Sequence, residues 1–246
     1  MITAALLPTP GDPFLARYWV RNYEQVWRGE VDQLIVLVNG TQPYEAADIF
    51  AKAGATVYTE PRRLGHGEAL RQLVGMTGAD TVVLVEDDAF VREPGAIRSH
   101  LDRASEGEVI GSPRGGMHPI LEQAARDKWG PVGGPDTSEG HGLWPCFLFI
   151  RRDMLLTTDL GFSSRFWGPG ETVPGLGYRI NGQALDTDTM TAVAFQLRDR
   201  FPISLVGQWK ELWQKNLPET GAPWFHAGGL STLDELIPGG MAGSNA

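Results

Sequence analysis

The chain has 246 residues, which is enough for one large domain or two small ones. Hydrophobic residues make up 42% of it, so it can bury a substantial core, and intrinsic disorder is not expected. The formal net charge of −9 opposes general affinity for nucleic acids or anionic membranes, although a local basic patch stays compatible with it.

The single cysteine, Cys146, excludes an intramolecular disulfide and a multi-cysteine zinc site, and it fits a reducing cytoplasm. The N-terminal apolar run is short, lacks a basic segment before it and is broken by Pro8 and Pro10, so it does not predict a signal peptide. No apolar run approaches the roughly 18 residues of a membrane span. We therefore expect a soluble, cytoplasmic protein without a membrane span.

The first part of the chain alternates apolar strands with amphipathic helices. The expected strands are 2–7, 33–39, 55–60, 81–86 and 107–112, and the expected helices are 13–29, 43–52, 67–77 and 94–104. Strands that are apolar on both faces and are separated by helices predict βαβ units. The fold class is therefore α/β, with a mainly parallel central sheet flanked by helices.

The second part is less regular. Glycine and proline are dense around 113–118 and 130–142, whereas strands are expected at 143–152 and 202–207 and a helix at 188–200. The glycine-rich segment 161–183 has the composition of a lid or an irregular loop. We expect one domain with two halves, 1–112 and 113–237, followed by a flexible tail at 238–246.

Three consecutive acids, Glu86, Asp87 and Asp88, directly follow the strand expected at 81–86. In open α/β sheets, ligands bind beyond the carboxyl ends of the strands. Clustered carboxylates at such a place are stable only if they are protonated, solvated or neutralised by a cation. An all-oxygen cluster prefers a hard divalent ion such as Mg²⁺ or Mn²⁺. The alternative is that these acids cap the next helix or face water.

The run 65–91 resembles the family-2-like GT-A glycosyltransferases, which use nucleotide sugars. It shows their order of a Gly-led helix, a small-residue turn and an apolar strand that ends in a DxD motif, here at Gly65, Gly67, Ala69, Arg71, Ala79, Asp80 and the acids 86–88. The resemblance implies a single-domain GT-A (Rossmann-like) fold. It also implies transfer of a sugar from a nucleotide-diphosphate sugar to an acceptor hydroxyl, with the donor bound in the half 1–112 and the acceptor in 113–237.

By position in that motif, Asp88 looks like the direct metal ligand. Glu86 looks like a residue that faces the donor ribose or a metal-bound water and serves as a second ligand, although a glutamate replaces the usual first aspartate. Asp87 is a donor-binding residue without a defined contact. His226, in 223-PWFHAGGLST-232, fits the late histidine that completes the metal site, and neutral imidazole binds Mn²⁺ beside carboxylates. The alternative is an ordinary core or surface histidine.

The resemblance also suggests which residues contact the donor. Thr9 and Asn39, at the ends of the first two expected strands, are placed near the nucleotide base. The basic side chains of Arg62, Arg63 and Arg71 and the backbone amides of Gly65 and Gly67 are candidates for the diphosphate, although Arg62 and Arg63 also suit an ordinary surface. A Mn²⁺ or Mg²⁺ ion would stabilise the charge that develops on the leaving diphosphate.

An inverting transferase also needs a carboxylate base, which in this family often opens a late helix. Asp186 is the preferred candidate and Asp188 the second, and either could instead be an N-cap. A retaining enzyme would need no such base, so the stereochemistry stays open.

Aromatic and polar residues of the second half are candidates for sugar contacts. They are Phe166, Trp167 and Tyr178 in the glycine-rich segment, Trp129 and Trp144 on the acceptor side, and Glu139 and His141 in a neighbouring loop.

The acceptor stays open among a glycan, a small molecule, a protein and a modified DNA base of the kind that phage enzymes use, and the location would be a bacterial or phage-infected cytosol. DNA would need a basic patch, for which Arg62, Arg63, Arg71 and Arg114 are available. A non-catalytic nucleotide-sugar binder also stays open.

Two other classes of enzyme fit the sequence less well. A nucleotidyltransferase is disfavoured because 7–18 lacks the Gly-rich run with Arg and Lys that is typical of such enzymes. A dehalogenase-type phosphatase is rejected at 186–190 because Met190 ends that motif and 181–185 predicts no strand.

Overall fold

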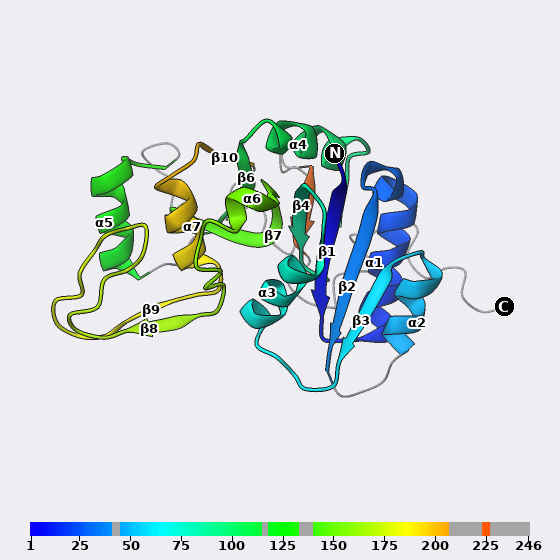
Figure 1. Ribbon diagram of the computed structural model, residues 1–246, viewed down its shortest axis with the longest axis horizontal. Helices are drawn as coiled ribbons and strands as arrows, with labels where there is room; N and C mark the ends of the chain where they lie inside the picture. Colours follow the sequence, from blue (N-terminus) through cyan, green and yellow to red (C-terminus); the bar gives the residue numbers. More distant parts are fainter. Residues whose placement is uncertain (41–44, 115–117, 133–139, 207–222, 227–246) are drawn as a thin grey trace.

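The computed structural model describes residues 1–40, 45–114, 118–132, 140–206 and 223–226. Its centre is a seven-stranded sheet (Figure 1). The strands, in spatial order, are β10 (Ile203–Leu205), β6 (Val109–Arg114), β7 (Gly142–Arg151), β4 (Thr81–Val85), β1 (Thr3–Thr9), β2 (Gln33–Asn39) and β3 (Thr56–Glu60). Strand β7 runs antiparallel to its neighbours β4 and β6, and the other pairings are parallel, so the expected mainly parallel sheet is confirmed.

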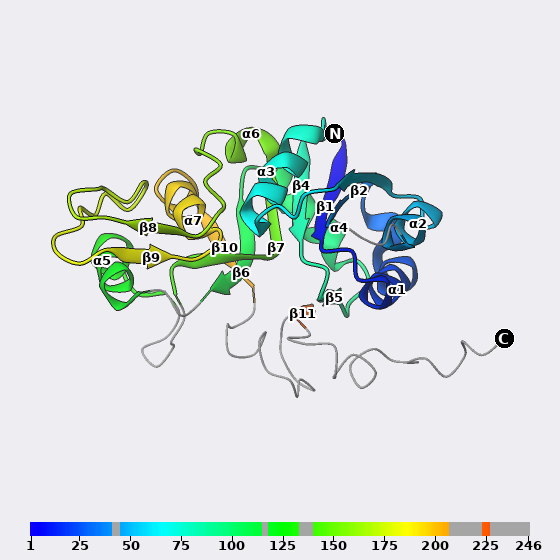
Figure 2. The ribbon, with the colours of Figure 1, turned by 90° about the horizontal axis from the view of Figure 1, so that it is seen from below.

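Helices cover both faces of the sheet (Figure 2). One face carries α1 (Pro13–Asn22), α2 (Glu45–Lys52) and α4 (Ala96–Ser105), and the other carries α3 (His66–Met76), α6 (Arg152–Leu155) and α7 (Thr191–Arg198). Successive residues of β1 point to opposite faces, so Ala5 and Leu7 enter one core and Ala4 and Leu6 the other. Because both faces of these strands are buried, their sequences are continuous apolar runs.

The first helix is shorter than the pattern 13–29 predicts. It begins where the carboxylate of Asp12 accepts the amides of Phe14 and Leu15, with Pro13 in its first turn. After Asn22 the winding changes to a π-helical turn, Tyr23–Trp27, and then to a 3₁₀ turn, Arg28–Glu30. The apolar periodicity is thus real, but it is carried by three kinds of helical turn.

The second half of the chain adds a smaller core at the end of the molecule opposite β3 (Figure 1). It lies between α5 (Pro119–Trp129), α7 and a two-stranded antiparallel sheet of β8 (Arg165–Trp167) and β9 (Leu185–Thr187). Helix α5 was not predicted, because the glycine and proline residues on either side of 119–129 indicate irregular structure. The expectation that 181–185 contains no strand residue is wrong at Leu185, which opens β9.

A second two-stranded antiparallel sheet joins β5 (Ala89–Val91) to β11 (Trp224–His226). Neither strand was predicted, because three residues are too few for a clear apolar pattern. The expected tail at 238–246 lies outside the described residues. Within the described part of the chain, no helix is long and apolar enough to cross a membrane.

Candidate functional site

The acids 86–88 lie where the order of the strands reverses. Strand β1 pairs with β2 on one side and with β4 on the other, so the carboxyl ends of β1 and β4 flank a crevice. A cavity of about 550 Å³ opens at this edge. Its lining residues are Pro8, Thr9, Pro10, Asn39, Arg63, Leu64, Gly65, His66, Glu86, Asp87, Asp88, Arg114, Trp144 and His226.

Glu86, Asp88 and His226 converge in this cavity. Each offers one ligand atom, and these atoms lie within 4.8 Å of one another. His226 Nε2 is 2.9 Å from Asp88 Oδ1 and 3.5 Å from Glu86 Oε2. Strand β11 brings the histidine here, because its pairing with β5 sets His226 opposite Ala89, directly after the acidic turn. The structure thus brings together the three residues that the sequence predicted as metal ligands.

The side chains of this cluster suit a divalent cation. Glu86 Oε2 is buried and accepts no hydrogen bond from the described residues. Desolvation, and next the charges of Asp88 and Asp87, raise the pKa of Glu86 well above its usual value. A buried carboxylate beside a second carboxylate and an imidazole is costly without a counter-charge, and two oxygens and one nitrogen form a normal ligand set for Mn²⁺.

Asp87 turns towards β1. Its Oδ2 accepts a hydrogen bond of 2.7 Å from the hydroxyl of Thr9, and desolvation raises the pKa of Asp87 to about 7. Asn39 is engaged in a similar way, because its side chain bonds both the carbonyl and the amide of Leu64. Thr9 and Asn39 both line the cavity, and their polar groups hydrogen-bond to its walls.

The Gly-led start of α3 also borders the cavity. Gly65 occupies the N-cap position of α3 without a side-chain cap, and both Gly65 and His66 line the cavity. Gly67 instead serves packing, since a Cβ there would lie 2.3 Å from the backbone nitrogen of Ser163. His66, whose Nδ1 is 3.8 Å from Glu86 Oε1, is not among the residues predicted for the site. Desolvation by the cavity wall lowers the pKa of His66, although 38% of its side chain is exposed.

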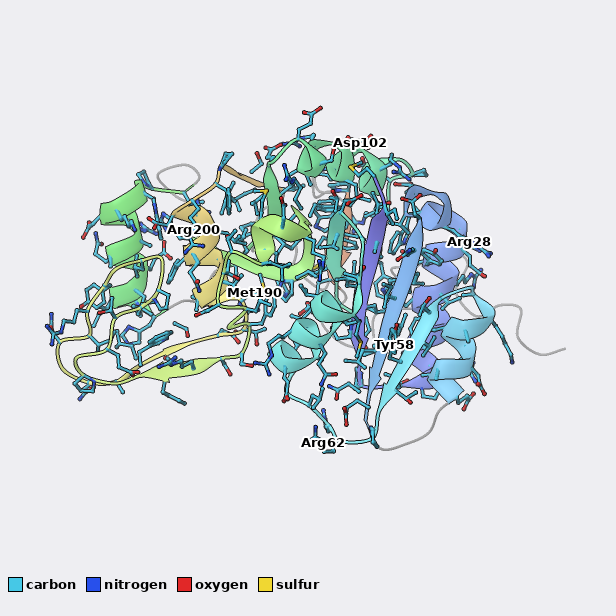
Figure 3. The ribbon with its side chains drawn as sticks, in the orientation of Figure 1. Arg28, Tyr58, Arg62, Asp102, Met190 and Arg200 are labelled. Carbon is cyan, nitrogen blue, oxygen red and sulfur yellow. The ribbon has the colours of Figure 1, made fainter. Side chains whose placement is uncertain are left out.

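The predicted arginines divide into two groups. Arg63 lines the cavity, whereas Arg71 is exposed and lies outside its lining. Arg62 is exposed, pairs with Glu60 and points outwards from the loop after β3 (Figure 3). Arg114, which sequence analysis considered only for DNA, forms an ion pair with Asp188 and lines the cavity.

A second cavity of about 430 Å³ adjoins the first, and Arg114 lines both. The other lining residues are His118, Pro119, Leu121, Ser164, Arg165, Phe166, Asp186, Thr187, Asp188 and Thr191.

Neither candidate base, Asp186 or Asp188, caps a helix, because α7 begins at Thr191 with Met190 in the cap position and no side-chain cap. Asp186 lies in β9 with its side chain exposed.

The candidate sugar contacts of the second half separate by burial. Phe166 is 77% exposed and lines the second cavity, whereas Trp167 is buried. Trp144 is not on the acceptor side as expected, because it lines the first cavity with its ring centroid 4.4 Å from that of His226. Tyr178 packs against the smaller core.

Of the three remaining candidates, two are structural and one lies outside the described residues. His141 is fully buried, and its two ring nitrogens hydrogen-bond Glu122 and the carbonyl of Gly130, so it does not face a ligand. Trp129 packs against the rings of His141 and Phe195. Glu139 lies outside the described residues.

Comparison with known proteins supports the fold. No family model and no curated protein matches the sequence. Among solved structures, glucosyl-3-phosphoglycerate synthase from Mycobacterium tuberculosis, in complex with Mn²⁺, uridine diphosphate and glucosyl-3-phosphoglycerate, matches with a TM-score of 0.50 and 20% identity. That match covers 83% of this chain and 70% of the other.

Two further matches have lower TM-scores. The same enzyme in complex with Mn²⁺ and uridine-diphosphate-glucose gives 0.47 at 23% identity, over 64% of this chain and 58% of that one. A structure described as a mycobacterial protein gives 0.45 at 22% identity, over 64% of this chain. This chain spans 55% of that protein's length. The fold is of the GT-A type, as expected from the sequence.

Proposed function

We propose that this chain is a metal-dependent glycosyltransferase that takes a sugar from a nucleotide-diphosphate sugar. The observation that carries the proposal is the convergence of the buried Glu86 Oε2 with Asp88 and His226, inside a cavity at the carboxyl ends of β1 and β4. A solved structure of similar fold is described as bound to Mn²⁺ and uridine diphosphate, which supports a metal ion and a nucleotide-sugar donor as ligands of this chain.

In this proposal, the first cavity binds the donor. Asp88, Glu86 and His226 hold Mn²⁺ or Mg²⁺, which when bound would offset the charge of the diphosphate leaving group. Arg63 and the uncapped start of α3 at Gly65 add positive potential on the same wall. The half 1–112 thus carries most of the donor site, and the described part of 113–237 carries the acceptor side.

Asp186 is the proposed base of an inverting transfer. It takes the proton of the acceptor hydroxyl while that oxygen attacks the anomeric carbon. The bond from this carbon to the diphosphate oxygen breaks, and its electron pair leaves with the nucleoside diphosphate. Asp188 is less suited to this role, because its carboxylate is ion-paired with Arg114 and accepts the amide of Thr189.

The test is the release of nucleotide from a panel of uridine and guanosine diphosphate sugars, with Mn²⁺ or with a chelator. We expect metal-dependent release with at least one donor and a loss of about 100-fold or more in Asp88→Asn. Asp102→Asn is the matched control, since Asp102 lies on α4 at the opposite end of the sheet from the loop of Arg62 (Figure 3). No release from any donor, or equal rates for Asp88→Asn and the wild type, would contradict the proposal.

A further inference from the structure

We propose that the second cavity binds an uncharged sugar ring, a glycoside or free sugar, as the acceptor. The inference rests on the proposed transferase function and names its acceptor class. The cavity shares Arg114 with the donor cavity, so a molecule bound in it lies next to the donor site. What it recognises follows from its charges, its hydroxyl-binding groups and its exposed ring.

The arginines of the second cavity are already neutralised. Arg114 is paired with Asp188. Arg165 Nη2 lies 2.6 Å from Glu171 Oε1, and its guanidinium carbon is 4.0 Å from the centroid of the Trp167 ring. A phosphate or carboxylate would have to compete with these carboxylates for the same guanidinium groups, which disfavours an anionic ligand.

Asp186 adds a carboxylate to the lining of the cavity. None of the described residues forms an ion pair or a side-chain hydrogen bond with it, and its side chain is exposed. Such a group repels an anionic ligand and accepts hydrogen bonds from hydroxyl groups, which a carboxylate binds well. The hydroxyl-bearing side chains of Ser164, Thr187 and Thr191 line the same cavity.

Phe166 lies beside this carboxylate. In the β8–β9 pair, Phe166 is directly opposite Asp186, and residues directly opposite in an antiparallel pair project from the same face. Phe166 is also 77% exposed, which is unusual for so large an apolar ring. An aromatic face next to a hydrogen-bond acceptor matches a sugar ring, whose C–H face is apolar and whose edge carries hydroxyls.

A DNA acceptor is less compatible with the same surface. Duplex binding rests on cationic side chains that neutralise phosphates. Of the four arginines considered for such a patch, Arg62 and Arg114 are already ion-paired, and Arg63 lines the donor cavity. The net charge of −9 also opposes association with DNA.

The test is ligand-observed saturation-transfer NMR on the full chain, with Mn²⁺ and either uridine or guanosine diphosphate present. The probes are methyl glucosides, mannosides and galactosides, with phosphoglyceric acid and a DNA duplex carrying a hydroxymethylated base as competing classes. We expect at least one methyl glycoside to bind. Phe166→Ala should weaken that binding about tenfold, and Phe166→Trp should retain it.

Ile120→Ala is the matched control, because Ile120 is an exposed apolar residue of α5 that does not line the cavity. This variant should bind the glycoside as tightly as the wild type does. Binding of phosphoglyceric acid or DNA without any glycoside would overturn the proposal. So would glycoside binding that Phe166→Ala leaves unchanged, or no binding by any glycoside.

Nucleotide release on the same samples separates this proposal from the transferase function. Release without a glycoside signal refutes the acceptor class alone. A glycoside signal without release refutes the transferase and leaves the cavity as a sugar-binding site.

Discussion

Thr9 and Asp87 join the ends of two neighbouring parallel strands, since the hydroxyl of Thr9, the last residue of β1, donates to Asp87 Oδ2 at 2.7 Å in the turn that follows β4. This bond spans the crevice where the strand order reverses. It holds one of three consecutive acids away from the Glu86, Asp88 and His226 cluster. Asp87, the middle residue of the motif, therefore forms part of the cavity wall, while its neighbours Glu86 and Asp88 face the proposed cation.

Replacing Thr9 with valine keeps the shape of the side chain and removes this hydrogen bond, together with the one that the hydroxyl accepts from the amide of Gly11. Because the Asp87 carboxylate then loses its donor in a desolvated position, we expect the free energy of unfolding to fall by about 1–3 kcal/mol in chemical denaturation. Thr59→Val makes the same change at an exposed position of β3 and should cost little. Equal stability of the two variants would mean that the hydrogen bonds of the Thr9 hydroxyl contribute nothing.

Replacing Asp87 with asparagine should stabilise the metal-free protein. The amide still accepts the Thr9 hydroxyl, but it carries no charge to desolvate beside Asp88. In a chelating buffer at slightly alkaline pH, we expect the midpoint of thermal unfolding to rise by about 2–4 °C. Asp102→Asn should leave the midpoint unchanged. A lower midpoint for Asp87→Asn would contradict the expectation that the buried Asp87 charge destabilises the metal-free protein.

Two glycines of α3 should respond to alanine in opposite directions. At Gly67 a Cβ meets the backbone of Phe162 and Ser163 within 2.5 Å, so Gly67→Ala should lower the free energy of unfolding by about 1–3 kcal/mol. At Gly75 nothing lies within 4 Å, so Gly75→Ala should raise it by about 0.5–1 kcal/mol. Chemical denaturation of both variants checks this, and a destabilising Gly75→Ala or a neutral Gly67→Ala would be inconsistent with the packing of α3.

The start of β2 should contribute a pH-dependent part of the stability. Asp32 Oδ2 accepts the amide and the hydroxyl of Thr3, and these bonds, the backbone one first, lower the pKa of Asp32. A lowered folded-state pKa stabilises the fold above the unfolded-state pKa of about 3.9, and this contribution is lost as the pH falls through the folded-state value. Asp32→Asn should therefore flatten the acid side of the stability curve. An unchanged curve would exclude this linkage.

The first part of the fold is predictable from the sequence because its signals are local. The strands β1, β2 and β4 are apolar on both faces, and the acids 86–88 directly follow one of them. The metal-ligand candidates Asp88 and His226 were identified from motif positions, and the structure brings their side chains together.

The contacts that complete the site are long-range and were not predictable. The pairing of β5 with β11 sets His226 against Asp88, yet each strand has only three residues. The Arg114–Asp188 pair and the place of Asp186 in β9 also depend on tertiary packing. His66 lies between two glycines, and the pattern 65–67 predicts a Gly-led turn without indicating a role for the imidazole.

The most direct test of the central claim is a Mn²⁺ titration followed by electron paramagnetic resonance, with the wild type, Asp88→Asn, His226→Gln and the control Asp102→Asn. If Glu86, Asp88 and His226 hold the cation, the wild type and Asp102→Asn bind one Mn²⁺ with equal affinity. Asp88→Asn and His226→Gln should then each bind at least about tenfold more weakly, since each loses a ligand. Wild-type affinity in both ligand variants, or no specific Mn²⁺ binding by the wild type, would contradict the account.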